Sequence, residues 1–378
     1  MKSVATPAKL ESRERCLFPF VFRVAKAVMP CSCQMLGVNM NKAGFADDGR
    51  LNVALVGLGW WGKVIGGDLR KSLKVRVAKA VDTAPAAGEW AQAQGFEFTT
   101  NYEEALADPS IGAVILCTPH TLHAGQIIAA ANAKKNVICE KPLTMTRCEA
   151  VAAVTACEAN NVLLGVGHEH RFKPAMIELL RAVRAGDLGT IQMVEATLTN
   201  PGKALAADNW RVQKKERPAG SMTALGIHGL DMCVAICGEA KNVLARSKSL
   251  VTPLEDTLGI LVDFKSGANA VITSITGPPF SIRFAVFGNK GWMELHDKTF
   301  PQAPQGWTLT RAKHGGGIAE ATEYPAMSMV RANAEAFADA VAGRAPYPVT
   351  YQEMIATIAA FEAISKSAES GQIVSVAG

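Results

Sequence analysis

The sequence has no C-x-x-C spacing, no apolar run long enough to cross a membrane, and no internal repeat or low-complexity tract. Its nine cysteines are odd in number and lie mostly in apolar segments, which is typical of small buried side chains and not of a disulfide framework. Crossing a bilayer takes about 20 consecutive apolar residues, so the pattern excludes a transmembrane helix. We therefore expect a cytoplasmic protein with a reduced interior and no membrane partner.

Strong charge of either sign is also missing. The formal net charge is +5, and residues 1–49 carry seven basic and four acidic side chains, so this segment accounts for +3. The rest of the chain therefore has a net charge of only +2, which is too small to attract the phosphate backbone of a nucleic acid. The charge distribution therefore excludes nucleic acid as a partner and leaves small molecules.

The first 49 residues lack the regular hydrophobic pattern of a helix or strand. Their apolar segment at 16–22 is broken by a proline, and no small-residue cleavage pattern follows at the distance of a secretory signal. There is no twin-arginine pair either. We expect an unstructured extension, or sequence upstream of a true start at Met35 or Met40.

What is present is a glycine-rich turn, Gly57-Leu58-Gly59-Trp60-Trp61-Gly62, between a predicted strand at 51–56 and a predicted helix at 63–72. A second strand at 74–81 ends in Asp82 and completes the βαβ unit of a dinucleotide fingerprint. In that motif Gly57 makes the tight turn, Gly59 lets the backbone approach a pyrophosphate, and Gly62 lets helix and strand pack closely. The pyrophosphate binds at the helix N-terminus. Asp82 would accept the ribose hydroxyls and repel a 2′-phosphate, which favours NAD over NADP.

Strand and helix patterns continue to alternate up to about residue 170. Further strands are predicted at 96–99, 111–117, 137–139 and 162–166. With crossover helices between them, they predict a doubly wound parallel sheet of six strands. Ligands of such a sheet bind beyond the carboxyl ends of its strands. The residues at those ends are Gly57, Asp82, Thr118, Lys141 and His168.

After about Phe172 the strand patterns follow one another too closely for helical crossovers, which predicts a largely antiparallel sheet. Its strands are expected at 191–198, 243–250, 257–264, 268–276, 282–287 and 292–296, and two helices at 328–341 and 351–370 close the chain. A chain of 378 residues favours two domains. We place the extension at 1–49, a dinucleotide-binding domain at 50–170, and a domain for substrate binding and oligomerisation at 171–378.

The chain resembles the Gfo/Idh/MocA oxidoreductase family from about Leu51 to its end. Besides the glycine turn, the resemblance rests on Asp108-Pro109-Ser110-Ile111-Gly112-Ala113-Val114-Ile115-Leu116-Cys117-Thr118-Pro119-His120, Glu140-Lys141-Pro142, Arg171-Phe172-x-Pro174, Gly186-Asp187-Leu188-Gly189 and Gly226-Ile227-His228-Gly229-Leu230-Asp231. It implies an α/β fold, with an N-terminal Rossmann domain followed by an α/β domain whose largely antiparallel sheet is open. The exposed face of that sheet usually makes dimers or tetramers in this family, which implies a homodimer or homotetramer.

The resemblance also implies the site residues. Lys141 and His228 are the implied catalytic pair, which handles the hydroxyl proton of an alcohol. We expect His228 to need little tuning to act near pH 7, and the alternative is a core histidine on an apolar helix. The implied cofactor-binding residues are Gly57, Leu58, Gly59, Trp60, Trp61, Gly62, Asp82, Cys117, Thr118, Pro119, His120, His123, Glu140 and Lys141. The implied substrate-binding residues are His168, His170, Arg171 and Trp210, and no metal is expected.

Two positions depart from the family pattern. Ala224 stands one helical turn before His228, where the family usually has an aspartate, and alanine can neither orient an imidazole nor bond a substrate hydroxyl. Glu169 stands where many members have asparagine. At strand period His168 and His170 share a face and Glu169 points away, so only two metal ligands converge and a role in lining the substrate pocket is favoured.

The implied function is NAD-dependent transfer of a hydride between nicotinamide and a carbinol carbon of a small polyol, sugar or cyclic diol. Two alternatives stay open on the same fold. One is a glycoside hydrolase that retains NAD, and the other is a non-catalytic nucleotide-sensing regulator with a protein partner. Net NADH production from an alcohol would separate the first function from the other two.

Overall fold

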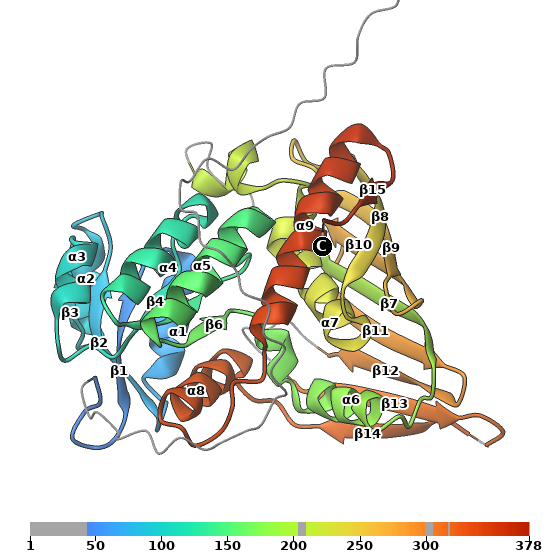
Figure 1. The fold of residues 1–378 in the computed structure, drawn as a ribbon, viewed down its shortest axis with the longest axis horizontal. Coiled ribbons are helices and arrows are strands. Elements are labelled where there is room, and N and C mark those ends of the chain that lie inside the picture. The colour runs from blue at the N-terminus through green and yellow to red at the C-terminus, as the bar shows by residue number, and fades with distance from the viewer. Residues whose placement is uncertain (1–43, 203–208, 299–304, 317, 378) are drawn as a thin grey trace, which may run out of the picture. The chain divides into compact units, whose positions relative to one another are not determined.

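The first sheet has six parallel strands in the order β3-β2-β1-β4-β5-β6, which confirms the predicted doubly wound sheet (Figure 1). The structure is a computed structural model that describes residues 44–202, 209–298, 305–316 and 318–377. The strands are β1 (Leu51–Val56), β2 (Val75–Val81), β3 (Glu97–Thr99), β4 (Ala113–Leu116), β5 (Asn136–Cys139) and β6 (Leu164–Val166). The strand order reverses between β1 and β4, and sheets of this kind bind ligands at that point.

Helices pack on both faces of this sheet. They are α1 (Trp60–Leu69), α2 (Ala87–Ala93), α3 (Tyr102–Ala107), α4 (His123–Asn132) and α5 (Arg147–Asn160). Side chains of β1 alternate between two apolar cores, one shared with α3, α4 and α5 and the other with α1 and α2. Asn101 caps α3 by accepting a hydrogen bond from the backbone N–H of Glu103, as expected.

The fold begins a few residues before β1, inside the segment expected to be an extension. The backbone N–H of Asn52 donates to the carbonyl oxygen of Gly44 at 2.9 Å. Phe45 forms an antiparallel bridge with Leu51 and packs against the core beside α1. Residues 44–49 are therefore part of the fold, and the expectation for residues 1–43 lies outside the described residues.

The second sheet has nine strands in the order β14-β13-β12-β11-β7-β10-β9-β8-β15. They are β7 (Ile191–Asn200), β8 (Ala240–Lys248), β9 (Thr257–Phe264), β10 (Asn269–Thr276), β11 (Ser281–Gly288), β12 (Gly291–Asp297), β13 (Trp307–Lys313), β14 (Glu320–Tyr324) and β15 (Val374–Ser375). Among the described strands only the β7–β10 pair is parallel, so the largely antiparallel sheet is confirmed.

Three strands of this sheet were not predicted. β14 is exposed over four of its five residues, and β15 has two residues, so neither has the apolar alternation that marks a half-buried strand. β13 alternates buried and half-buried side chains only over Trp307–Thr310. These strands form because they extend the edges of a sheet whose central strands are strongly apolar.

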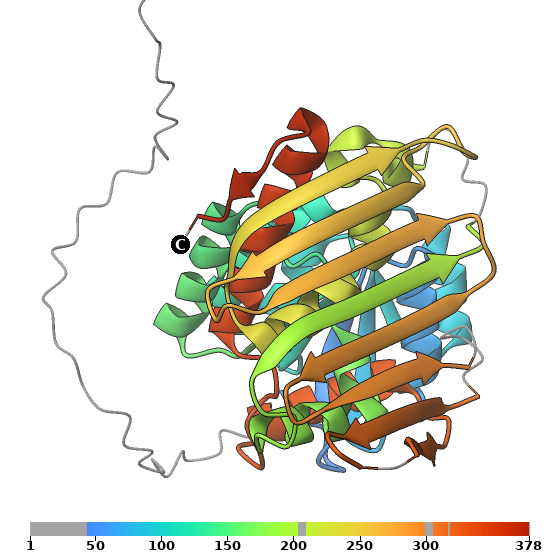
Figure 2. The same cartoon turned by 90° about the vertical axis from the view of Figure 1, so that its right-hand side faces the viewer.

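One face of the second sheet is covered by helices and the other is open. The covering helices are α6 (Pro174–Arg184), α7 (Ile227–Cys237) and α9 (Tyr351–Ser370). Figure 2 looks onto the opposite face, where no helix of the described chain lies in front of the strands. Leu261 on β9 and Val271 on β10 point out from this face and are 43% and 41% exposed. The expected open sheet with apolar residues on both faces is present.

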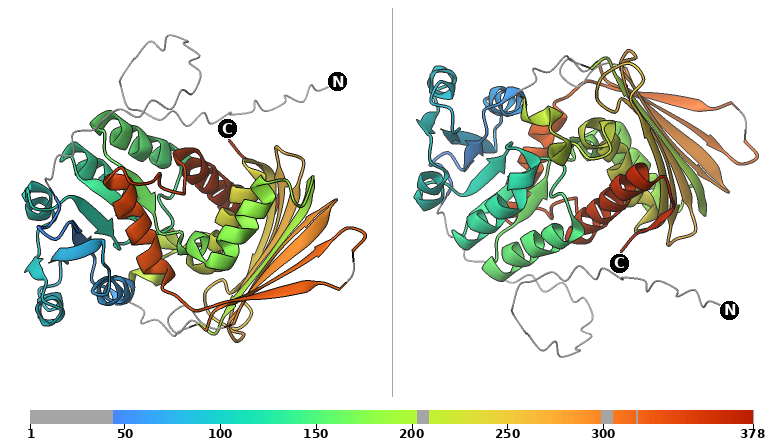
Figure 3. Two further views of the ribbon diagram at one scale, coloured as in Figure 1. Left: turned by 90° about the horizontal axis from the view of Figure 1, so that it is seen from below. Right: turned by 90° about the horizontal axis from the view of Figure 1, so that it is seen from above.

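The last two helices join the two sheets. α8 (Met329–Val341) packs through Phe337 against the first sheet, in the core beside α1. α9 lies between the sheets in Figures 1 and 3, with Ile358 in the core of the first and Phe361 in the core of the second. The predicted boundary at 170/171 separates the strands of the two sheets along the chain. However, α8, which comes after this boundary, packs against the first sheet.

No helix in the described part of the chain is long and apolar enough to cross a membrane. Five cysteines within that part, Cys117, Cys139, Cys157, Cys233 and Cys237, are free and buried. Their burial agrees with their interpretation as small core side chains.

Candidate active site

The turn between β1 and α1 has the backbone geometry that its glycines predict. Gly57 has φ = +92°, and a Cβ there would lie 2.7 Å from the carbonyl oxygen of Cys117 at the end of β4. A Cβ on Gly62 would lie 1.9 Å from the carbonyl oxygen of Gly57, so only glycine lets α1 pack this close to the turn. At Gly59 no described atom comes within 4 Å of the Cβ position, which leaves this backbone open to a ligand.

Asp82 ties the end of β2 to the glycine turn. Its carboxylate accepts hydrogen bonds from the backbone N–H of Leu58 at 2.7 Å and from that of Ala84 at 2.9 Å. A carboxylate oxygen has two lone pairs, so each oxygen can still accept a hydrogen bond from a hydroxyl. Asp82 is therefore fixed at the place where a ribose would lie.

These features fit a dinucleotide such as NAD. α1 begins after Gly59 without a side-chain cap, and an uncapped helix N-terminus suits a pyrophosphate. The open approach at Gly59 and the spare lone pairs of Asp82 suit a pyrophosphate and a ribose hydroxyl. The expected cofactor therefore fits the residues present.

The loop after β4 forms the next part of the cofactor cleft. Cys117, Thr118 and His120 line the cleft, with His120 at the start of the short helix η1 (His120–Leu122). His123 does not line it: its ring is fully buried, with Nδ1 2.8 Å from the carbonyl oxygen of Pro142 and Nε2 3.1 Å from that of Thr118. His123 thus braces the loop after β4 against the loop after β5.

Lys141 reaches across the cleft from the end of β5. It precedes a cis peptide bond to Pro142, and its Nζ donates to the carbonyl oxygen of Ala224 at 2.8 Å. Removal from water lowers the pKa of Lys141, and the carboxylates of Glu169 and Glu140 oppose that shift.

The carbonyl groups that hold Lys141 belong to a π-helical turn, η5 (Met222–Gly226), directly before α7. Such turns occur mostly at functional sites. Thr223 and Leu225 are buried, whereas Ala224 between them is exposed and lines the cleft. The methyl group of Ala224 therefore occupies a cleft position where the family usually has a carboxylate.

His228 lies in the first turn of α7, on the floor of the cleft. It is 4% exposed, and its ring stacks on that of His170, with centroids 4.3 Å apart and an interplanar angle of 11°. Burial, and then the nearby His170 and Lys141, lower the pKa of His228 well below its usual value. The expectation that His228 needs little tuning to act near pH 7 is therefore wrong, because its environment strongly disfavours the imidazolium.

Glu169 also lies on the floor, which corrects the expectation that it points away from the histidines. β6 ends at Val166, and Glu169 starts a 3₁₀ turn, η2 (Glu169–Phe172), so the period of two no longer applies. Its Oε1 lies 3.8 Å from Nε2 of His228. Burial, and then the charge of Glu140, raise the pKa of Glu169 to about 8, and Lys141 opposes this shift.

Glu169, His170 and His228 each offer one ligand atom within 4.8 Å of the others, so three groups converge, and they are not the pair His168 and His170 expected from the sequence. The stacked rings of His170 and His228 lie in nearly parallel planes, and so do their nitrogen lone pairs, which suits a shared metal ion poorly. Nδ1 of His170 also lies 3.2 Å from Nζ of Lys173, a neighbouring cation. We therefore interpret the group as a proton-handling cluster.

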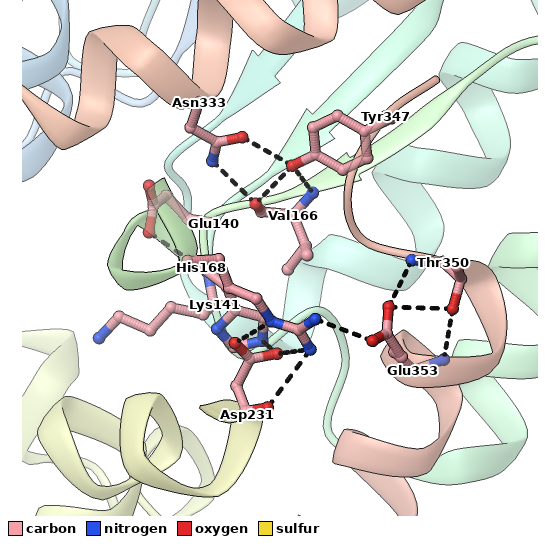
Figure 4. Close-up of polar contacts among 10 residues, drawn as sticks. Glu140, Lys141, Val166, His168, Asp231, Asn333, Tyr347, Thr350 and Glu353 are labelled. Carbon is pink, nitrogen blue, oxygen red and sulfur yellow. Dashed lines mark hydrogen bonds and ion pairs between the residues drawn. The ribbon is translucent and has the colours of Figure 1, made fainter. Parts of the chain in front are cut away.

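Two of the predicted substrate-binding residues, His168 and Arg171, lie behind the floor and do not line the cleft. The guanidinium of Arg171 donates to both carboxylate oxygens of Asp231, at 2.7 and 2.8 Å, and to Glu353 at 2.9 Å. Figure 4 shows this network, with His168 beside Asp231 and Lys141 extending away from both. These residues fix η2 against α7 and α9, and so position Glu169 and His170 at the cleft.

The cleft is closed on one side by a polar loop. Trp210, in η3 (Trp210–Val212), lines the cleft and contacts His120 edge to face, with centroids 4.9 Å apart. Glu216, in η4 (Lys214–Glu216), accepts hydrogen bonds from the backbone N–H and the hydroxyl of Thr121. These hydrogen bonds hold the loop against η1 beside the cleft.

The whole cleft has a volume of about 470 Å³, within the range of small-molecule sites. Ten of the predicted site residues line it: Trp60, Trp61, Cys117, Thr118, His120, Glu140, Lys141, His170, Trp210 and His228. It is not lined by Gly57, Leu58, Gly59, Gly62, Asp82 or Pro119. The cavity thus joins two residues of the glycine turn, Trp60 and Trp61, to the polar floor.

Two family models match this chain. A model described as "Oxidoreductase family, NAD-binding Rossmann fold" matches residues 51–168, and "GFO/IDH/MocA C-terminal domain" matches residues 176–294. The chain belongs to this family. The resemblance inferred from the motifs is confirmed.

Curated relatives are about one-third identical to the chain. Levoglucosan dehydrogenase of Pseudarthrobacter phenanthrenivorans is 32% identical over 210 residues, which is 52% of this chain and 53% of that protein. Myo-inositol 2-dehydrogenase of Thermotoga maritima is 30% identical over 197 residues, 50% of this chain and 57% of that protein. The chain thus spans little more than half the length of these relatives.

Among solved structures, aldose-aldose oxidoreductase from Caulobacter crescentus has a TM-score of 0.76 at 24% identity, covering 86% of this chain and 99% of the other. Levoglucosan dehydrogenase in complex with NADH and levoglucosan has a TM-score of 0.75 at 23% identity, covering 87% and 100%. At these identities the likeness shows a shared fold.

One buried ion pair beneath the floor has no counterpart in any local sequence pattern. Lys173, fully buried, donates to both carboxylate oxygens of Asp297, at 2.8 and 2.6 Å. Asp297 ends β12, more than 120 residues further along the chain, so no local pattern links the two residues. The pair places a cation beside His170 and contributes to the low pKa of that imidazole.

Proposed function

We propose that this protein is an NAD-dependent oxidoreductase that acts on a carbinol carbon of a small polyol, sugar or cyclic diol. The observation that carries the proposal is a cleft in which Trp60 and Trp61 of the glycine turn and the ends of β4 and β5 meet a buried floor of titratable groups. The convergence of Lys141 and His228 in that cleft supports their assignment as the catalytic pair.

NAD, when bound, would supply a nicotinamide carbon that accepts or donates a hydride. The protein's part is to orient the substrate and to move the hydroxyl proton. Lys141 is anchored to the Ala224 carbonyl oxygen and has further donors for the substrate oxygen. Removal from water lowers the pKa of Lys141, so a substrate oxygen that accepts from its ammonium replaces part of the lost solvation. His228, buried and neutral, can hold the same hydroxyl by a hydrogen bond.

The substrate class follows from the walls of the cleft. The side chains that line the cleft include the aromatic rings of Trp60, Trp61 and Trp210 as well as the polar groups of Lys141, Glu169 and His228. Aromatic walls suit the apolar faces of a ring, and the floor suits one hydroxyl group. Relatives named for levoglucosan and myo-inositol favour the same class.

We also propose that NAD is preferred over NADP. Asp82 stands at the end of β2 with its carboxylate fixed by two backbone N–H groups, so it cannot turn away from a 2′-phosphate without losing them. Repulsion between these two negative groups would disfavour NADP.

The test combines binding with turnover. Calorimetry should detect binding of NADH to the full chain, and NADH should accumulate when NAD⁺ is supplied with one of levoglucosan, myo-inositol, D-xylose or a trans-dihydrodiol. Absence of NADH binding would contradict the proposal. Release of a phenol from an aryl glycoside without net NADH would favour the NAD-retaining hydrolase.

A further inference from the structure

The floor of the cleft contains the carboxylate of Glu169, which comes from η2 and not from the turn before α7. At Ala224, on the turn before α7, the side chain is a methyl group exposed to the cleft. Glu169, on η2 after β6, lines the same cleft with its carboxylate. Its side chain is only 7% exposed, and its Oε2 has no hydrogen-bond partner among the described residues. A buried carboxylate without a partner is costly unless something else uses it.

The position of this carboxylate matches a bound hydroxyl. Oε1 of Glu169 lies 3.8 Å from Nε2 of His228, too far apart for a direct hydrogen bond. One oxygen atom can contact both atoms at about 2.8 Å, the usual hydrogen-bond length. A substrate hydroxyl at that point would donate to one of the two groups and accept from the other.

We propose that Glu169 is a catalytic residue, which takes the proton of the substrate hydroxyl in place of the carboxylate missing at Ala224. This inference rests on the proposed oxidoreductase function. In the oxidation the substrate O–H bond breaks and an O–H bond forms on Glu169. The C–H hydrogen leaves with its electron pair to NAD⁺, and a C=O bond forms. In the reduction, protonated Glu169 returns the proton to the same oxygen.

The charges around the floor favour Glu169 over His228 as the acceptor. His228 faces His168, His170, Lys141 and Lys173, all of which lower the pKa of the imidazole further below the value set by burial. Glu169 faces Lys141 and Lys173, which lower its pKa, and Glu140, which raises it. The balance leaves Glu169 with a pKa of about 8, close to the working range of a general base. His228 then orients the hydroxyl as a neutral imidazole.

The first experiment needs neither cofactor nor substrate. The full chain is labelled with ¹³C-glutamate, and the Glu169 carboxyl signal is assigned by its loss in Glu169→Gln. A titration midpoint near 8 supports the proposal. A midpoint below about 6, close to an ordinary glutamate, would overturn it.

The second experiment compares pH profiles of turnover on whichever panel alcohol reacts. The wild-type rate of oxidation should rise with pH as Glu169 loses its proton, with a midpoint near 8. Glu169→Gln copies the protonated form, so it should lose this rise and fall about 100-fold or more below wild type at high pH. Glu216→Gln is the matched control, because Glu216 lines the cleft but bonds Thr121, and its profile should keep the rise.

The third experiment places a carboxylate at position 224, on the turn before α7, in a chain that lacks the carboxylate of Glu169. Ala224→Asp in the Glu169→Gln background should recover at least about tenfold of the lost rate, because both positions line the same cleft. A merely structural role of Glu169 would not be rescued from another element. No recovery, together with an unchanged pH profile in Glu169→Gln, would overturn the proposal.

The outcomes separate this inference from the proposed function. Failure of the wild-type chain to bind NADH would contradict the oxidoreductase. Normal NADH binding by Glu169→Gln with a normal alkaline rise would contradict only the role of Glu169. Stoichiometric zinc in the purified chain, lost in Glu169→Gln, would instead show that the cluster is a metal site and would also overturn the proposal.

Discussion

The glycine turn and the polar floor are both parts of one cleft, but they depend on the sequence in different ways. The turn is made by six consecutive residues whose geometry is local: Gly57 and Gly62 are needed because a Cβ would meet neighbouring backbone atoms. The floor gathers Lys141, Glu169 and His228 from the end of β5, from η2 and from α7. A motif therefore describes the turn completely, whereas the floor exists only once the two sheets have packed together.

From this contrast we predict that a single substitution on the floor lowers turnover more than a single substitution in the glycine turn. Lys141→Ala and His228→Ala should each lower turnover by roughly 10²–10⁴-fold, the usual contribution of a positioned acid–base group. His228→Ala should leave the affinity for NADH unchanged, because the imidazole faces the substrate part of the cleft. Steady-state kinetics with calorimetry as the control measures both. Full activity in the double variant would contradict the proposed mechanism.

The second prediction concerns the buried ion pairs behind the floor, which hold its residues in place, and compares them with an exposed ion pair. Asp231→Ala would leave the buried guanidinium of Arg171 with Glu353 as its only carboxylate partner among the described residues. Breaking a buried pair in this way costs about 3–5 kcal/mol of unfolding free energy, measured by urea denaturation. Glu178→Ala breaks the exposed pair with Arg181 and should cost less than about 1 kcal/mol. Equal effects of the two variants would show that the network does not support the floor.

At the glycine turn, removal of the Asp82 carboxylate should change the preference between NAD and NADP. Asp82→Ala removes the carboxylate that stands where the ribose binds, so the preference for NAD over NADP should fall by about tenfold, or 1.4 kcal/mol. The backbone N–H of Leu58 also loses its acceptor, so affinity for NAD should fall somewhat as well. Calorimetry with both cofactors is the measurement. Tighter binding of NADP⁺ than NAD⁺ by the wild-type chain would contradict the proposal at once.

The same contrast explains what the sequence could predict. The six strands of the first sheet and the tight turn at Gly57 follow from local patterns, whereas the open second sheet was implied by the family resemblance. The position of Glu169 was mispredicted because a strand period was extended past Val166, where the chain turns into η2. The low pKa of His228 depends first on burial and then on His170, Lys141 and Lys173, and this environment exists only in the tertiary fold. No local pattern contains that information.

A smaller effect is expected on the open face of the second sheet. Val271 is an exposed apolar side chain on a central strand, and an uncovered apolar face of this kind favours contact with a second copy. We predict a homodimer or homotetramer that Val271→Lys weakens. Val251→Lys, in the exposed loop after β8, is the matched control and should not change the assembly. Sedimentation at micromolar concentration measures both, and a wild-type monomer would contradict the prediction.

The smallest effect is expected at the N-terminal side of the glycine turn. Deleting residues 1–39 keeps Gly44 and Phe45, whose contacts with Asn52 and Leu51 extend β1, so the free energy of unfolding should change by less than about 1 kcal/mol. Deleting residues 1–49 removes those contacts and the packing of Phe45 beside α1, and should lower the melting temperature by several degrees.

NADH affinity should follow the same order in the two truncated chains, because β1 leads directly into the glycine turn. The first truncation should bind like the full chain, and the second should bind more weakly as β1 loses its anchor at Gly44. Thermal denaturation and calorimetry on both truncations make the comparison. If the shorter deletion already weakened binding or aggregated, the turn would depend on distant residues just as the floor does.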